Sequence, residues 1–131
     1  FDSVDTVKMC LDVFAPMVAT MEVHADVMYK AAQGGFINAT DLADYLVGKG
    51  EPFRTAYKTV GGIVAYAVRE HTVLDAIPLD VYKQFDANFE ADLYDAIKLE
   101  TCVAKRTSAG GTSPASFAAE HDYVASFLGK Q

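Results

Sequence analysis

The chain begins with apolar residues spaced for one side of an α-helix. The larger ones alternate between three and four positions apart, which is the heptad spacing of helices that pack against each other. They are Val4, Val7, Leu11, Phe14, Val18, Met21, Ala25 and Met28. This seam predicts a single helix of about seven turns.

The seam also predicts that this helix has partners. Burying its residues larger than Ala would contribute on the order of 10 to 20 kcal/mol, at roughly 1.5 to 3 kcal/mol each, which is comparable with the stability of a whole domain. Further apolar residues beside the seam indicate more than one partner helix. Pro16 interrupts the pattern. Because an interior proline costs about 3 kcal/mol, less than the seam would lose, we expect a kink at Pro16 and not an end.

After this helix the spacing predicts several shorter ones. Gly34 and Gly35 supply a stop. Asn38 or Thr40 can then cap a short helix that Gly48 and Gly50 close. Pro52 suits the first position of the following helix, where its missing N–H costs nothing.

That following helix extends through Val68 and contains Gly61 and Gly62, which we expect to allow close helix–helix approach. Turns and short helices are predicted around Pro78, from Phe89 to Ile97 and around Val103. Ser113 is the expected N-cap of a last helix that begins at Pro114. With no convincing strand, the fold class is all-α.

The amino-acid composition limits the classes of partner that we expect for this chain. The net charge is −7, and among the eleven Lys and Arg residues only Lys105 and Arg106 are adjacent. Because no basic stripe could neutralise phosphates, we expect no nucleic-acid or anionic-membrane partner. No apolar run approaches the ~18 residues that would cross a bilayer. Two cysteines without a CxxC spacing favour a reducing, cytoplasmic setting.

The residues that could carry chemistry do not form a recognisable motif. His24, His71 and His121 are far apart and lack metal-ligand spacing, so we expect no metal site. His24, placed on the first helix, is an acid–base candidate, although a structural histidine is the simpler interpretation. Neither Cys10 nor Cys102 has a neighbouring histidine that would activate it.

Two other features leave alternatives open. Gly110 and Gly111 precede a helix and could bind an anion through backbone N–H groups, or could form only a capped loop. The carboxylate pairs Asp41 with Asp44 and Asp92 with Asp95 lie three residues apart and could in principle serve as acid and base. On acidic helices such pairs are usually solvated.

One stretch of the sequence indicates a protein family more specifically than it indicates any chemical reaction. It comprises Ala39-Thr40-Asp41-Leu42-Ala43-Asp44-Tyr45-Leu46-Val47, Lys49-Gly50, Pro52-Phe53-Arg54 and Ala56. It resembles the C-terminal signature of the argininosuccinate lyase family, and the similarity extends through Val60-Gly61 and Gly110-Gly111-Thr112 over essentially the whole chain. Tyr57 departs from the family, which usually has a histidine there.

The resemblance implies a fold, partners and a reaction. The family belongs to the fumarase and aspartase superfamily of helical homotetramers with a central bundle, so residues 1–34 would end a bundle helix and residues 35–131 would form the C-terminal helical domain. The implied reaction splits argininosuccinate into arginine and fumarate without a cofactor.

The family's catalytic loop, of Ser-Ser-x-Met-Pro type, and its histidine motif do not occur here. No catalytic, cofactor-binding or metal-binding residue can therefore be assigned. Because the chain begins at Phe1 without a signal-peptide pattern, we expect it to be an inactive piece of a longer protein. The alternative is a non-catalytic helical interaction module, or a structural one of the lens-crystallin type.

Overall fold

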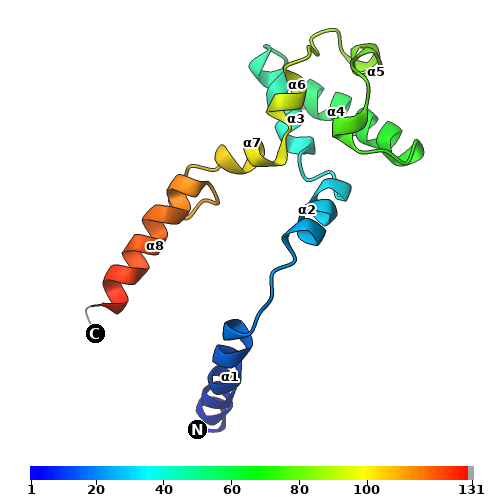
Figure 1. Cartoon of the computed structure of the whole chain (residues 1–131). Helices are drawn as coiled ribbons and strands as arrows, with labels where there is room; N and C mark the ends of the chain where they lie inside the picture. Colours follow the sequence, from blue (N-terminus) through cyan, green and yellow to red (C-terminus); the bar gives the residue numbers. More distant parts are fainter. Residues whose placement is uncertain (130–131) are drawn as a thin grey trace. The chain divides into compact units, whose positions relative to one another are not determined.

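The computed structural model describes residues 1–129, in which the regular elements are all helices and there is no strand (Figure 1). The chain divides into two compact units, Phe1–Ala31 and the part from Ala32 onward. The all-α fold class is therefore confirmed. The helices are α1 (Asp2–Ala19), α2 (Ala25–Gly34), α3 (Ala39–Gly48), α4 (Phe53–Arg69), the 3-10 turn η1 (Leu74–Ala76), α5 (Leu79–Phe85), α6 (Leu93–Ala96), α7 (Leu99–Ala104) and α8 (Pro114–Leu128).

The expected single helix at the start of the chain is in fact two helices. α1 passes through Pro16 but ends at Ala19, and α2 begins at Ala25. Pro16 has no N–H to donate, which removes one backbone bond from the last turns of α1. The Thr20 hydroxyl then donates to the carbonyl oxygen of Pro16 at 2.9 Å, which closes the helix end. The helix thus continues past Pro16, as predicted, but it ends at Ala19, so the prediction of a single helix of about seven turns was wrong.

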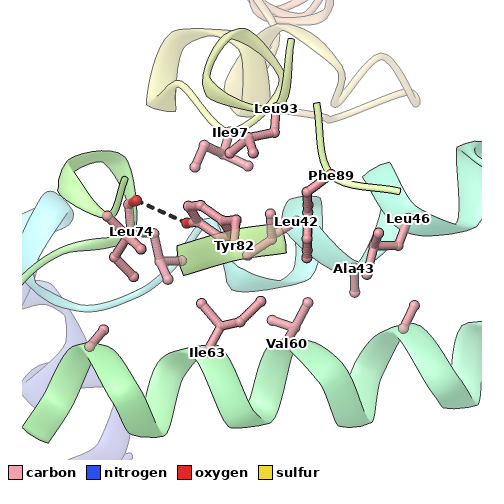
Figure 2. Packing of buried hydrophobic residues seen from close by; sticks show 13 residues of the cluster. Leu42, Ala43, Leu46, Val60, Ile63, Leu74, Tyr82, Phe89, Leu93 and Ile97 are labelled. Atoms are coloured by element: carbon pink, nitrogen blue, oxygen red, sulfur yellow. Dashed lines mark hydrogen bonds between the residues drawn. The ribbon is translucent and has the colours of Figure 1, made fainter. Parts of the chain in front are cut away.

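The hydrophobic core lies in the second unit (Figure 2). Leu42 and Leu46 of α3 face Val60 and Ile63 of α4, and Tyr82 of α5 closes the same space. The other members of this cluster come from the same segment of the chain: Ala43, Ala56, Ala67, Leu74, Ile77, Phe89, Leu93 and Ile97. The core is thus built by α3 to α6 and the loops between them.

Two tyrosine hydroxyls tie the loops to this core. The Tyr82 hydroxyl donates to the carbonyl oxygen of Leu74 at 2.9 Å, the bond drawn in Figure 2, and the Tyr94 hydroxyl donates to that of Ile77 at 2.7 Å. Burial raises the pKa of both phenols. The Tyr82 ring can therefore be buried, and the Tyr94 ring partly buried, without leaving either hydroxyl group unpaired.

α3 and α4 end in the same hydrogen-bonding pattern. After α3, Gly50 has φ +103° and the Glu51 N–H donates to the carbonyl oxygen of Leu46 at 3.0 Å. After α4, His71 has φ +51° and the Thr72 N–H donates to that of Ala67 at 2.9 Å. Both ends are Schellman motifs, whose left-handed position is usually glycine. The stop predicted at Gly50 is confirmed.

The residues that we predicted at the N-termini of helices are only partly confirmed. Ser113 caps α8 as expected, because its side chain accepts the Ser116 N–H at 3.1 Å. Asn38 stands at the N-cap of α3 but its side chain does not cap. It donates instead to Asp75 and to the carbonyl oxygen of Ile97, at 3.1 and 3.0 Å. Pro52 is the N-cap of α4, one residue before the predicted position.

The two glycines inside α4 do not serve a close approach of helix backbones. Among residues 1–129, a Cβ at Gly61 would meet no atom within 4 Å. A Cβ at Gly62 would lie 3.4 Å from the Phe85 ring, so the neighbour of Gly62 is an aromatic side chain from α5. The explanation that we gave for this glycine pair was wrong.

Candidate functional site

An exposed apolar surface lies on α1. We call it the apolar face of α1, by which we mean Val4, Val7, Leu11, Phe14 and Val18. All five are exposed, with 61% of Leu11 and 60% of Phe14 accessible. Met9, Val13 and Met17 extend the apolar surface, and no residue of α1 is buried. Large contiguous apolar surfaces of this kind mark sites of association.

The structure does not bring the three histidines together with partners for catalysis. His24 lies in the segment between α1 and α2, not on a helix, and is exposed. His71 holds the left-handed position after α4. His121, on α8, is exposed and lies 3.5 Å from the adjacent Asp122. The assignment of His24 to the first helix was wrong.

Asp41 departs most from expectation, because it is buried where we predicted a solvated carboxylate. Only 1% of Asp41 is exposed. Its Oδ2 accepts a hydrogen bond from the Arg106 guanidinium at 2.9 Å. Its Oδ1 is buried and has no hydrogen-bond partner among residues 1–129. A buried carboxylate depends strongly on its ionic partner, here Arg106.

Cys102 of α7 completes this group, the Asp41 cluster, which consists of Asp41, Cys102 and Arg106. Burial, followed by hydrogen bonding to Asp41 and by its charge, raises the pKa of the Cys102 thiol to about 11. The thiol is therefore protonated near neutral pH, and the thiol form is a poor nucleophile. This arrangement is unsuited to covalent catalysis.

The other carboxylates of the two predicted pairs bind separate cations or face solvent. Asp44 is exposed. Asp92 accepts from the Tyr45 hydroxyl at 2.5 Å and from Lys49 at 3.2 Å, and these contacts lower its pKa. Asp95 instead pairs with Lys98 at 2.6 Å. Neither pair forms a joint acid–base site.

Lys49 links α3 to the loop before α6. Its ammonium group lies 2.5 Å from Glu90 and 3.2 Å from Asp92, and both contacts raise its pKa. The Tyr45 ring stacks on Phe89, with ring centroids 6.0 Å apart. This exposed network fastens the loop to α3, and it leaves Lys49 engaged with two carboxylates.

The glycine loop before α8 is held by its own backbone. The Gly111 N–H donates to the carbonyl oxygen of Ser108 at 2.8 Å, so it is not free for an anion. A Cβ at Gly111 would lie 2.3 Å from the carbonyl oxygen of Arg106. Close backbone packing therefore explains this glycine, and the capped-loop alternative describes the structure better than the anion site.

Within the described part of the chain, no three His, Cys, Asp or Glu side chains gather as metal ligands. None of its helices is long and apolar enough to cross a membrane.

Fold and surface together define a class: a small all-α domain with its own core, accompanied by a helix whose apolar face is exposed. A family profile described as "Argininosuccinate lyase C-terminal" matches residues 36–104, which hold the core. The chain belongs to the argininosuccinate lyase family. The resemblance found in the Ala39 to Ala56 signature is thereby confirmed.

Individual relatives agree with this assignment. The chain is 44% identical, over all 131 residues, to the argininosuccinate lyase of Acetivibrio thermocellus, and covers 29% of that protein. It is 51% identical over 111 residues to that of Ruminiclostridium cellulolyticum, covering 85% of the chain and 24% of the relative. It is 52% identical over 114 residues to that of Desulforamulus reducens, covering 87% and 25%. The chain thus spans about a quarter of the length of these curated relatives.

Proposed function

We propose that this chain is the C-terminal region of an argininosuccinate lyase, and that the whole polypeptide splits argininosuccinate into arginine and fumarate during arginine biosynthesis in the cytoplasm. The observation that carries the proposal is the match of its core to the family's C-terminal profile. The 44% identity to a named argininosuccinate lyase over all 131 residues supports it.

The role of the chain itself, in this proposal, is folding and assembly. Residues 1–34 end a helix of the central bundle, and residues 35–131 form the C-terminal domain. The apolar face of α1 supports this division, because Leu11 and Phe14 are exposed in the chain alone. Equivalent helices of a homotetramer would bury them, at roughly 1.5 to 3 kcal/mol for each side chain.

We place the acid and the base of the reaction outside this chain. Eliminating fumarate requires a base to take a proton beside a carboxylate and an acid to assist the leaving nitrogen. In the described residues His24, His71 and His121 are exposed and dispersed, and the Cys102 thiol is kept protonated. No cofactor enters this mechanism.

The alternative is a structural relative of the lens-crystallin type, which keeps the fold and lacks the activity. The observation that favours it is the same dispersal of titratable side chains. Reading the polypeptide that precedes Phe1 for the family's serine loop and histidine motif separates the two functions.

An activity assay of the purified chain tests the proposal that the catalytic acid and base lie outside it. We expect no fumarate, followed by its ultraviolet absorbance, when the chain is mixed with argininosuccinate. Intact helicity by circular dichroism is the control that the chain is folded. Turnover by the folded chain would show that it contains a complete site, contrary to the proposal.

A further inference from the structure

Arg106 binds two separate parts of the second unit at once. Its guanidinium donates to Asp41 Oδ2, in the first turn of α3, at 2.9 Å. Its carbonyl oxygen accepts the Ser113 N–H, at the start of α8, at 3.1 Å. One residue therefore connects the core helix α3 with the origin of α8.

The loop between these two contacts is tightly closed. Gly111 donates back to Ser108, and there is no room for a Cβ at Gly111 against the Arg106 carbonyl. Ser113 is buried, and its hydroxyl also donates to Ser116 Oγ at 2.9 Å. Residues 106–113 and the first turn of α8 are thus one hydrogen-bonded piece, which can move as a unit.

α8 has no comparable second attachment in the described chain. None of its residues is buried, and its apolar side chains Phe117, Tyr123 and Phe127 are exposed. The buried Ser113, just before the helix, is the point at which it meets the remainder of the unit. Whatever loosens Arg106 therefore loosens the start of α8.

The Asp41 carboxylate, on the other side of the contact, is poorly stabilised without the Arg106 guanidinium. Its Oδ1 has no hydrogen-bond partner among residues 1–129, and the carboxylate is almost fully buried. Removing the guanidinium would leave a buried charge without an ionic partner, which is strongly unfavourable. The cluster is therefore stable only with the ion pair made, or with the local structure opened to water.

We propose that the Asp41–Arg106 ion pair is a latch. When closed, it holds residues 106–113 and the start of α8 against α3 and keeps the buried Cys102 beside it covered. When it opens, the loop and the start of α8 are released together and the thiol is uncovered, while the core between α3 and α4 stays folded. Cys102 is thus a thiol whose accessibility reports the state of the latch.

The test compares two cysteines in one chain, because Cys10 is exposed and Cys102 is buried. Alkylation by iodoacetamide, followed by mass spectrometry of peptides, gives the Cys102 rate relative to the Cys10 rate. Amide hydrogen exchange is measured at Ser113 and Ser116, and at Leu46 and Ile63 in the core. The variants are R106Q, R106K and D41N, with R69Q as matched control, since Arg69 is at the surface, where it pairs with the adjacent Glu70 and lies over the Tyr66 ring.

We expect R106Q to raise the relative Cys102 rate at least about tenfold and to speed exchange at Ser113 and Ser116, while Leu46 and Ile63 stay protected. D41N removes the buried charge as well as the ion pair, so it should stay folded and still speed exchange at the start of α8. R106K should lie between R106Q and the unmodified chain, and R69Q should behave like the latter.

Two results would overturn the latch. One is unchanged Cys102 alkylation and unchanged Ser113 exchange in both R106Q and D41N. The other is loss of protection at Leu46 and Ile63 together with Ser113 in D41N, since this would make the ion pair a support of the whole core and not a local device.

Discussion

Gly50 and His71 occupy the same left-handed position at the ends of α3 and α4, but only one of them is a glycine. A left-handed backbone costs an L-residue about 1 to 2 kcal/mol, because its Cβ approaches the carbonyl oxygen. No chemical role is assigned to His71 from the sequence. In the structure, His71 contributes through its left-handed backbone conformation and not through its imidazole.

Exchanging these two residues tests this interpretation. His71→Gly should raise the free energy of unfolding by about 0.5 to 1 kcal/mol, since relief of strain exceeds the added freedom of the unfolded chain. Gly50→Ala should lower it by about 1 kcal/mol. Urea unfolding monitored by circular dichroism measures both, and a stability loss in His71→Gly would mean that the imidazole makes a contribution we have not identified.

Local capping chemistry could be predicted where it depends on neighbours in sequence, and failed where it depends on distant ones. Ser113 caps a helix whose first turn it adjoins, so its role was predictable. Asp41 was expected to be solvated because its partner, Arg106, is 65 positions away. The sequence shows both halves of this ion pair: a carboxylate among apolar helix positions, and the adjacent basic residues Lys105 and Arg106. Nothing in the sequence indicates that the two halves pair with each other.

At the scale of elements, the apolar periodicity predicted the faces of the helices better than their ends. The seam of the first helix continues in register through Met21 and Ala25, although residues 21–24 are not helical. Phe89 fits the same kind of spacing but lies in a loop, where the Asn88 N–H donates to the Asp86 side chain at 2.8 Å. A spacing pattern does not register such local hydrogen bonds, which end or interrupt helices.

α4 offers a direct test of which face is the core. Ile63→Ala should lower the free energy of unfolding by about 2 to 5 kcal/mol, because Ile63 is fully buried between α3 and α5. Val68→Ala is the matched control in the same helix, since 57% of Val68 is exposed, and should change stability by less than about 0.5 kcal/mol. Urea unfolding followed by tyrosine fluorescence measures both, and equal effects would contradict the assigned core.

At the scale of the whole molecule, the hydrophobic core and the apolar face of α1 lie in different units. The segment that matches the family's C-terminal profile, residues 36–104, contains the core and can bury its own apolar residues. The apolar face of α1 is accessible throughout. This contrast is the physical reason for the proposed role of the chain in assembly.

The most direct test of the central claim is the activity of a chimeric enzyme. This chain would replace the matching segment of the Acetivibrio thermocellus argininosuccinate lyase, to which it aligns over all 131 residues. We predict a folded tetramer by light scattering that releases fumarate from argininosuccinate at a rate within about tenfold of the unaltered enzyme, a difference of about 1.4 kcal/mol. A chimera that folds and assembles but does not release fumarate would contradict the claim and favour the structural alternative.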